Sequence, residues 1–517
     1  MQWGKWEYLA DMIRILVFSF VVMVGGCTTL QPDPVRNISH TIPPASSGAL
    51  AETADKLRLP PGVTAAMPLS AAQEALDWRL ALVDHAITSI DIQYFIWSSD
   101  EAGILLFDRL MQAADRGVRV RLLVDDLALD GSDHNIAVYS RHPNFEIRIY
   151  NPGRVRKSAL GGIGEFMLYF RALNRRMHNK LFVVDNRFAI LGGRNIGNSY
   201  FGLSKKYNNR DMDLLLAGAI VPEISQAFDK YWNAELAYPG GAMSPSASIE
   251  ELPERRKVLE MYLEQHSETL SSYPMQRQDW KNLFKLLPQR VDIGKGHFLQ
   301  DIPVSHDGRE LKLVDMIDQI AGESHEELIL VSPYFIPTEG LLESIAEQVS
   351  RGVKVKILTG SLGSNNHTAV HSHYRKYRRK ILAAGAELYE FRHDPSEHIR
   401  AISDVPPVTA GFISLHAKAL VADRDKVFIG SLNLDPRAVV INTENGIYFE
   451  SSALGKDLAT RFDIMMLPEN AWRVFIDKND ELRWESSEGI VTRQPARTWG
   501  QRITDFFFGL LPIESQL

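Results

Sequence analysis

Two stretches of the chain share one pattern of hydrophobic and polar positions. Residues 89–97 (SIDIQYFIW) and 327–337 (ELILVSPYFIP) are apolar runs rich in β-forming residues, and both contain Tyr-Phe-Ile. In the runs that follow, over 101–126 and 339–360, apolar residues first recur at helical spacing up to an Arg-Gly-Val. Beyond it they alternate with polar residues. Each stretch therefore predicts a strand, a helix closed by glycine and a second strand.

The two stretches are predicted to belong to copies of one domain. Equivalent positions lie 240 residues apart at Tyr94 and Tyr334, and 238 apart at His178 and His416. So nearly constant an offset indicates a duplicated α/β domain. Alternation of strands and helices predicts sheets that are covered by helices on both faces.

The remaining segments are divided around these copies. We predict an N-terminal domain over 69–245, a partly helical connector over 246–300 and a C-terminal domain over 301–480. Residues 28–68 are rich in Pro, Ser and Ala, which predicts a tether. Residues 481–517 are predicted to form an amphipathic tail, whose apolar stripe suits docking on the second domain and lying in a bilayer interface equally well.

Residues 1–27 are typical of an exported leader. Arg14 precedes the apolar run 15–24, which is shorter than the about 20 residues that span a membrane. Small residues and Cys27 follow, as in a signal peptide. The segment VGGC resembles the lipobox of bacterial lipoproteins, which predicts lipidation of Cys27; an uncleaved signal anchor is the alternative. Both place the protein on a membrane of the bacterial cell envelope, facing the periplasm, and Thr28 resembles the pattern that is sorted to the outer membrane.

Composition narrows the class of protein. The chain has 517 residues, of which 45% are hydrophobic and 23% charged, as expected for a globular protein. A net charge of −7 argues against a protein whose main activity is binding a polyanion such as duplex DNA. With one cysteine, the chain forms no internal disulfide.

The candidate chemistry lies in residues 175–195 and 414–433. A histidine, a lysine, an aspartate, a glycine and an asparagine recur in both segments at identical offsets: His178, Lys180, Asp185, Gly192 and Asn195 opposite His416, Lys418, Asp423, Gly430 and Asn433. A lone histidine before an apolar strand is more often structural than catalytic. Two complete sets at equivalent positions of duplicated domains reverse that expectation.

These residue types suit attack on a phosphodiester. An imidazole has a free pKa of about 6.5, so much of it is neutral at pH 7 and able to attack phosphorus, while a second imidazole protonates the departing alkoxide. Lys180 and Lys418 can neutralise the non-bridging oxygens, and Asn195 and Asn433 can donate hydrogen bonds to them. The scheme requires no metal and no cofactor.

The pattern H-x-K-x4-D-x6-G-[GS]-x-N, present twice, resembles the phospholipase D superfamily, and the likeness extends from about residue 70 to 470. The segments RRMHNKLFVVDN (175–186) and GSLNLDPRAVVINTENGI (430–447) are similar to bacterial cardiolipin synthases of the C type. The resemblance implies an α/β fold of two pseudo-symmetric α/β/α sandwich domains with the active site at their interface.

The resemblance also implies individual roles. His178 becomes the nucleophile and His416 the acid/base, with Glu444 orienting His178 and Asp211 orienting His416. Such carboxylates fix a tautomer and favour the imidazolium form. Asp213, close to Asp211, leaves that second assignment open. Asp185 and Asp423 belong to the catalytic motif, but we expect them first to brace the loops at their strand ends.

The implied activity is phosphatidyl transfer to phosphatidylglycerol through a phosphohistidine, with phosphatidylglycerol or phosphatidylethanolamine as donor. The implied partners are these phospholipids and a membrane surface, and no nucleic acid. A hydrolytic phospholipase D, a nuclease of the same superfamily and a non-enzymatic membrane scaffold are the alternatives.

Three weaker features remain. The histidines of HTAVHSH (367–373) have a spacing that could hold zinc, without a cysteine or an evident acidic ligand beside them. The basic run 375–380 is by default a solvated helix face, whereas the resemblance favours a site wall where His371 and Arg378 meet an anionic headgroup. Residues 154–177, basic at both ends and aromatic in the middle, suit a rim in the membrane interface and an ordinary core helix equally.

Overall fold

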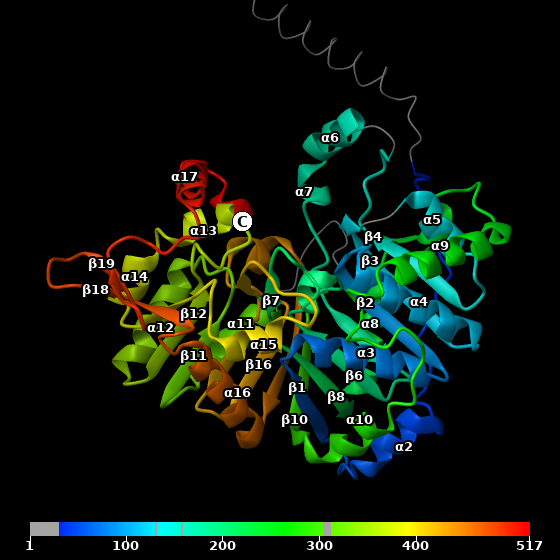
Figure 1. Cartoon of the computed structure of the whole chain (residues 1–517), viewed down its shortest axis with the longest axis horizontal. Helices are drawn as coiled ribbons and strands as arrows, with labels where there is room; N and C mark the ends of the chain where they lie inside the picture. Colours follow the sequence, from blue (N-terminus) through cyan, green and yellow to red (C-terminus); the bar gives the residue numbers. More distant parts are fainter. Residues whose placement is uncertain (1–29, 130–131, 157–158, 303–311) are drawn as a thin grey trace, which may run out of the picture.

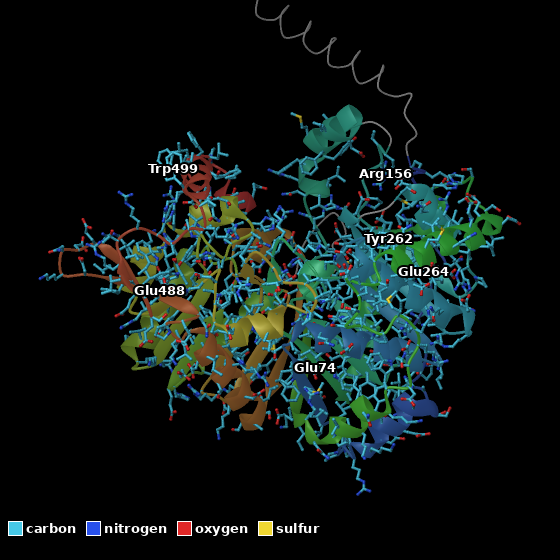
Figure 2. All side chains as sticks on the ribbon, viewed as in Figure 1. Glu74, Arg156, Tyr262, Glu264, Glu488 and Trp499 are labelled. Atoms are coloured by element: carbon cyan, nitrogen blue, oxygen red, sulfur yellow. The ribbon has the colours of Figure 1, made fainter. Side chains whose placement is uncertain are left out.

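The computed structural model describes residues 30–129, 132–156, 159–302 and 312–517. Two halves lie side by side, each built on a mixed sheet (Figure 1). Side chains fill the space between them (Figure 2). Cys27 and the rest of the leader lie outside the described residues.

The sheet of the N-terminal half has the strand order β1-β8-β6-β5-β2-β3-β4-β9. Strands β2, β3 and β4 are parallel to one another, and the other pairings are antiparallel. The strands are β1 (Thr64–Leu69), β2 (Ser89–Trp97), β3 (Arg119–Leu129), β4 (Phe145–Tyr150), β5 (Leu181–Val184), β6 (Phe188–Gly192), β8 (Asp213–Gly218) and β9 (Ala237–Pro239).

The sheet of the C-terminal half repeats this order as β10-β17-β16-β15-β11-β12-β13-β18, and β19 and β20 extend it. The predicted duplication is therefore visible strand by strand. The strands are β10 (Asp292–Gln300), β11 (Glu327–Val331), β12 (Lys354–Gly360), β13 (Glu387–Phe391), β15 (Ala419–Ala422), β16 (Lys426–Gly430), β17 (Asn445–Glu450), β18 (Ala471–Ile476), β19 (Leu482–Ser486) and β20 (Gly489–Val491).

Helices cover both faces of each sheet, and the buried apolar side chains form three cores. Two of them are outer cores, one in each half, and the third is a central core shared by both halves. In strand β5, Phe182 packs into an outer core with helices α3 and α4, whereas Val183 faces a central core with helix α8. Helix α16 enters the same central core from the other half, and α11 and α12 pack in the second outer core. The helices are α3 (Ala72–His85), α4 (Glu101–Asp115), α5 (Asp133–Tyr139), α8 (Val221–Trp232), α11 (Lys312–Gly322), α12 (Glu339–Ser350), α13 (Thr368–Tyr374), α14 (Arg378–Ala383), α15 (Glu397–Ser403) and α16 (Ser452–Met465).

The connector predicted over 246–300 contains more than helices. Helices α9 (Leu252–Gln265) and α10 (Lys281–Leu286) lie against the N-terminal half, but strand β10 at its end belongs to the sheets. The first part of β10 pairs with β1 and the rest pairs with β17, so this strand joins the two sheets. Its short glycine-containing sequence, DIGKGHFLQ, has a weak apolar pattern, which explains why the sequence did not reveal it.

The segments predicted as tether and tail are also folded. Between residues 30 and 68, helix α2 (Gly48–Lys56) and strand β1 pack on the N-terminal half. The extended chain before α2 is held by buried side chains: the Ser39 amide donates to Asn233 (3.1 Å) and Arg121 donates to the Ser39 carbonyl (3.1 Å). Beyond residue 480, β19 and β20 continue the second sheet and helix α17 (Trp499–Phe508) docks on α13. No helix in the described residues is long and apolar enough to cross a membrane.

Candidate active site

Two short pairings of backbone between the halves position the motif histidines. Strand β7 (Asn208–Arg210) runs parallel to β14 (Ile413–Leu415), so that Asp211 and His416 follow side by side. A parallel bridge between Met177 and Thr443 does the same for His178 and Glu444. The amide of each histidine donates to the opposite half at 2.9 Å, His178 to the Thr443 carbonyl and His416 to the Arg210 carbonyl. Because the pairings are equivalent, the duplicated domains exchange carboxylates.

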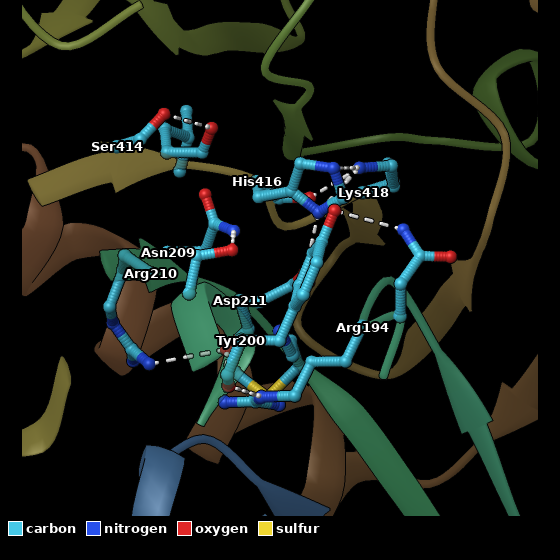
Figure 3. Close-up of polar contacts among 12 residues, drawn as sticks. Arg194, Tyr200, Asn209, Arg210, Asp211, Ser414, His416 and Lys418 are labelled. Atoms are coloured by element: carbon cyan, nitrogen blue, oxygen red, sulfur yellow. Dashed lines mark hydrogen bonds and ion pairs between the residues drawn. The ribbon is translucent and has the colours of Figure 1, made fainter. Parts of the chain in front are cut away.

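Each histidine forms a buried dyad with a carboxylate of the other half. His178 Nδ1 lies 2.8 Å from Glu444 Oε2. His416 Nδ1 lies 2.6 Å from Asp211 Oδ2, and Figure 3 shows this second dyad. Asp213 is engaged elsewhere, in ion pairs with Arg79 (2.9 Å) and Arg194 (3.4 Å). The structure therefore distinguishes the two neighbouring aspartates, which the sequence left open. With Nδ1 occupied, Nε2 of each histidine is the nitrogen left for chemistry.

Lys180 and Lys418 are buried beside their histidines. Lys180 Nζ donates to the His178 carbonyl (2.7 Å), and Lys418 Nζ lies 3.1 Å from His416 Nδ1 and 3.3 Å from its Nε2. Burial lowers the pKa of Lys180 to about 7 and that of Lys418 to about 8. A bound anion would stabilise the ammonium form of each lysine and raise its pKa, as expected for side chains that bind a phosphate.

The electrostatics favour neutral imidazoles. Burial lowers the pKa of His178 well below its ordinary value, and Lys180 and Lys418 lower it further. Burial and Lys418 lower the pKa of His416 to about 3, against the opposing effect of Asp211. The sequence predicted that the carboxylates would favour the imidazolium form. In the structure, burial and the lysines lower the pKa of both histidines by more than the carboxylates raise it. Each histidine also responds to the lysine of the other half, so the two motifs share one electrostatic environment.

The motif asparagines differ from each other. Asn195 is already engaged, because its Oδ1 accepts from the Ile96 amide (3.1 Å) and its Nδ2 donates to the Tyr200 hydroxyl (3.0 Å). Asn433 is buried, and its Oδ1 has no hydrogen-bond partner among the described residues. Both polar atoms of the Asn195 side chain are therefore hydrogen-bonded within the protein, whereas Oδ1 of Asn433 is not.

The motif aspartates brace loops instead of entering the site. Asp185 accepts from three consecutive backbone amides, those of residues 87–89, at 2.8–3.1 Å. Asp423 accepts from those of residues 325–327 at 2.8–3.2 Å. Each lies beyond the end of its strand, whereas the histidine lies before the start. These contacts are those of the bracing role that we expected first for both aspartates, and their catalytic role stays a prediction.

Sequence reasoning missed several residues that shape the site. Phe95 and Tyr200 place their rings edge-on to His178 and His416, with centroids 5.0 and 5.3 Å apart. The Ser431 hydroxyl donates to Glu444. Asn445 accepts from the Lys180 amide (3.0 Å) and donates to the Lys180 carbonyl (3.1 Å). Phe95, within the repeated Tyr-Phe-Ile, and Ser431, at the [GS] position of the motif, carried a signal in the sequence; Tyr200 and Asn445 did not.

His371 and Arg378 belong to a buried network and not to a headgroup site. His371 Nδ1 lies 2.7 Å from Asp505 of α17, and Arg378 pairs with Glu390 at 2.6 Å. His373 lies 3.0 Å from Glu514. In the described part of the chain, no group of three or more His, Cys, Asp or Glu side chains is arranged to hold a metal ion.

A cavity of about 630 Å³ lies behind the first dyad. Its wall includes Thr443 and Arg176, next to the bridge that positions His178 and Glu444. Exposed Arg154, Arg171 and Arg175 also line it.

Paired dyads contributed by duplicated α/β domains define the class: a two-domain protein of the phospholipase D-like fold. The chain resembles the crystal structure of a phosphatidylserine synthase from Haemophilus influenzae, with a TM-score of 0.55, 15% identity and coverage of 82% of this chain and 91% of that one.

The sequence matches the family described as "Cardiolipin synthase, PLD-like domain" over residues 80–233 and 316–466. It is 32% identical to cardiolipin synthase C of Escherichia coli over 88% of this chain and 96% of that protein. It is 25% identical to a cardiolipin synthase of Oceanobacillus iheyensis over 76% and 66%, respectively. The chain therefore belongs to the cardiolipin synthase family of phospholipase D-like proteins, and it is a phosphatidyltransferase enzyme of that superfamily.

Proposed function

We propose that this protein transfers a phosphatidyl group from one phospholipid to the terminal hydroxyl of phosphatidylglycerol, with a phosphohistidine on His178 as intermediate. The observation that carries the proposal is the pair of histidine–carboxylate dyads, each assembled from both halves. A transfer in two displacements needs one histidine as nucleophile and another as acid and base. The duplicated site supplies both.

In the first step, His178 Nε2 attacks phosphorus. The N–P bond forms, the bond from phosphorus to the headgroup oxygen breaks, and the departing alkoxide takes a proton from His416. The anionic phosphodiester raises the pKa of His416 on binding, which opposes the effect of Lys418 and makes the protonated imidazole accessible. Lys180 and Lys418 compensate the charge on the non-bridging oxygens.

In the second step, the phosphatidylglycerol hydroxyl gives its proton to neutral His416 and attacks the phosphohistidine. An O–P bond forms, the N–P bond breaks, and cardiolipin and free His178 result. Nothing is oxidised or reduced, and both histidines return to their starting states.

The cavity beside the first dyad supports an anionic acceptor. Arginines outnumber carboxylates in its lining, with Arg36, Arg154, Arg171, Arg175 and Arg176 against Asp33, Glu165 and Glu235. Guanidinium groups bind phosphate oxygens well. An acceptor that carries its own phosphate fits such a wall better than water or a neutral alcohol, which favours transfer over hydrolysis.

We extend the proposal to the location of the protein. The apolar run 15–24 and Cys27 support a lipidated or signal-anchored protein of the bacterial envelope that faces the periplasm. Both phospholipids of the proposed reaction would then reach the site from the membrane that holds the protein.

The test is to incubate the full-length protein with labelled phosphatidylethanolamine and unlabelled phosphatidylglycerol and to identify the products by mass. We expect cardiolipin from the wild type and none from His178→Ala. With the label in the acyl chains, labelled cardiolipin identifies phosphatidylethanolamine as the donor, and unlabelled cardiolipin identifies a second phosphatidylglycerol. Asp185→Asn is the matched control, since it alters a motif residue outside the site. Phosphatidic acid as the sole product would replace the proposal with a hydrolase, and an absence of lipid turnover would refute both.

A further inference from the structure

Two helices of the protein turn a carboxylate toward the protein and expose apolar side chains, the reverse of the usual arrangement. On α17, Asp505 is fully buried, where it contacts His371 (2.7 Å) and accepts from Gln494 (2.9 Å). Five of the large apolar side chains of this helix and the turn after it are exposed instead: Trp499, Phe506, Phe507, Leu510 and Leu511. Ile503 and Phe508 are half-buried. A helix on a surface that faces water normally buries its apolar stripe and exposes its charges.

The segment that leads into the first motif shows the same inversion. On α6 (Ala159–Leu168), Glu165 turns toward the protein and accepts from the amides of Arg154 (2.9 Å) and Val155 (2.8 Å). The exposed side chains of α6, α7 (Phe170–Leu173) and the residue between them are mostly apolar or aromatic, with Arg171 as the one exposed charge among the described side chains. The large ones are Ile163, Phe166, Met167, Leu168, Tyr169 and Phe170.

Exposed aromatic side chains occur nowhere else in the described residues. All of them lie on these two segments: Phe166, Tyr169, Phe170, Trp499, Phe506 and Phe507. Scattered exposed apolar residues are ordinary, but a concentration of aromatic rings on one side of a protein marks an interaction surface.

The two segments face the same way and are linked beside the candidate active site. Helices α6, α7 and α17 rise from one edge of the molecule, the upper edge in Figure 1, and Trp499 projects from that edge in Figure 2. The Asn174 side chain, directly after α7, donates to Gln516 (2.9 Å) and accepts from Arg437 (2.9 Å). Arg437 in turn contributes to lowering the pKa of His178. The linked surface therefore borders the first dyad.

We infer that the α6–α7 segment and α17 together form a docking face that inserts into the surface of a phospholipid bilayer, with the candidate active site between them. Aromatic side chains with apolar neighbours are the composition that binds the headgroup region of a membrane. The inference rests on the proposed function only in taking bilayer phospholipids as the substrates.

The position and charge of the face favour a bilayer over a partner protein. The described chain begins at Leu30, whose amide donates to the Arg154 carbonyl (3.0 Å), so the apolar run 15–24 joins the protein next to α6. Exposed Arg154, Arg171 and Arg175 accompany the face although the net charge of the chain is −7. Local positive charge on an acidic protein is suited to anionic lipid.

The test places an environment-sensitive dye on single cysteines of the full chain, in a Cys27→Ser background that leaves no other thiol. Met167→Cys and Phe507→Cys report the two segments, whose side chains are 74% and 61% exposed. Leu286→Cys on α10, 48% exposed at the opposite edge, is the control. In vesicles of phosphatidylethanolamine and phosphatidylglycerol, we expect blue-shifted emission and quenching by spin-labelled lipid at positions 167 and 507 but not at 286.

A second measurement uses charge to disrupt docking. Met167→Glu combined with Phe507→Glu should raise the KM for vesicle substrate on the order of tenfold or more, since burial of two large apolar side chains is lost. With short-chain monomeric lipids, the kcat of this double variant should equal that of the wild type. Leu286→Glu should leave the KM for vesicle substrate unchanged.

The two proposals fail separately. Dyes at 167 and 507 that respond no more than the dye at 286, while the protein is bound to vesicles, would overturn the docking face. Lipid contact at both positions without any cardiolipin formed would leave the docking face standing and refute the transferase.

Discussion

At the scale of single residues, the two dyads are not equivalent. Gly193 lies against Asp211, where an added Cβ would come within 2.2 Å of Oδ1. At the equivalent position of the other half, the Ser431 hydroxyl donates to the longer Glu444. The site thus has a closely packed aspartate behind His416 and a hydrogen-bonded glutamate behind His178. This asymmetry supports different roles for the two histidines.

Glu444→Gln tests the charge behind His178. The amide oxygen can still accept from Nδ1, so the orientation is kept while the negative charge that stabilises developing positive charge on the ring is lost. We expect kcat to fall on the order of 10²- to 10⁴-fold, with much less change in KM. Steady-state kinetics checks this, with Ser431→Ala as a milder companion. Unchanged kcat in Glu444→Gln would contradict the assignment.

The lysines predict how anion binding depends on pH. Burial lowers the pKa of Lys180 to about 7 and that of Lys418 to about 8, so the two ammonium groups lose their charge as pH rises through this range. An anion binds the protonated form and therefore takes up protons on binding. The affinity for sulfate, which stays a dianion throughout, should decrease from about pH 6 to about pH 9. Calorimetric titration at several pH values measures it, and the slope should flatten in Lys180→Met.

At the scale of elements, each half uses one carboxylate to fasten a loop to a strand end. Asp185 and Asp423 both adopt left-handed backbone angles, with φ of 53° and 49°. Each carboxylate accepts from the loop that precedes the neighbouring strand of the sheet, β2 or β11. The braced strands, β2 and β11, pair with β5 and β15, the strands that follow the motif histidines. The motif thus combines chemistry at one end of a strand with a structural fastening at the other.

Asp185→Ala should consequently reduce stability more than catalysis. Loss of the acceptor for three amides, one of them buried and two partly buried, should cost about 2–4 kcal/mol of the free energy of unfolding. Asp423→Ala should cost less because its loop is more exposed to water. Urea denaturation measures both, and the kcat of the folded variants should stay near the wild-type value. A collapse in kcat at unchanged stability would return these aspartates to the catalytic set.

At the scale of the whole molecule, the halves are joined so that neither has a complete site. Strand β10 pairs with both sheets, and helices α8 and α16 share the central core. Across the seam, Asn179 donates to the Glu444 carbonyl (3.1 Å) and Thr443 donates to Asn179 (2.8 Å). The position of each carboxylate relative to its histidine therefore depends on the packing of the two domains.

Asn445→Ala should reveal this dependence. Its amide satisfies both backbone groups of Lys180 across the seam, and their loss should cost about 2–4 kcal/mol and lower kcat because His178 shifts relative to Glu444. Asn144→Ala is the matched control, since Asn144 donates to Ala114 within the N-terminal half (3.0 Å). It should reduce stability and leave kcat unchanged. Equal effects of the two variants on kcat would argue against the seam as a positioning device.

Much of this architecture could be predicted from local patterns. Duplication, the strand–helix–strand units and the two histidine motifs were all readable, because each depends on residues close together in sequence. The fastening by Asp185 and Asp423 followed from their places at strand ends. The folded state of residues 30–68 and strand β10 could not be predicted, because their weak apolar patterns are completed by partners far along the chain.

The sequence by itself determined the chemical groups: two imidazoles and two ammonium groups in matching copies of one α/β unit, since a motif consists of residue types at fixed spacing. The resemblance already implied Glu444 for His178 and Asp211 for His416. Only the tertiary structure brought these groups into contact, paired Asp213 with arginines instead, and showed that α6 and α17 expose apolar side chains. The physical reason is distance along the chain: His178 and Glu444 are 266 residues apart, and His416 and Asp211 are 205 apart. Contacts of that kind arise only when both domains have folded and packed together.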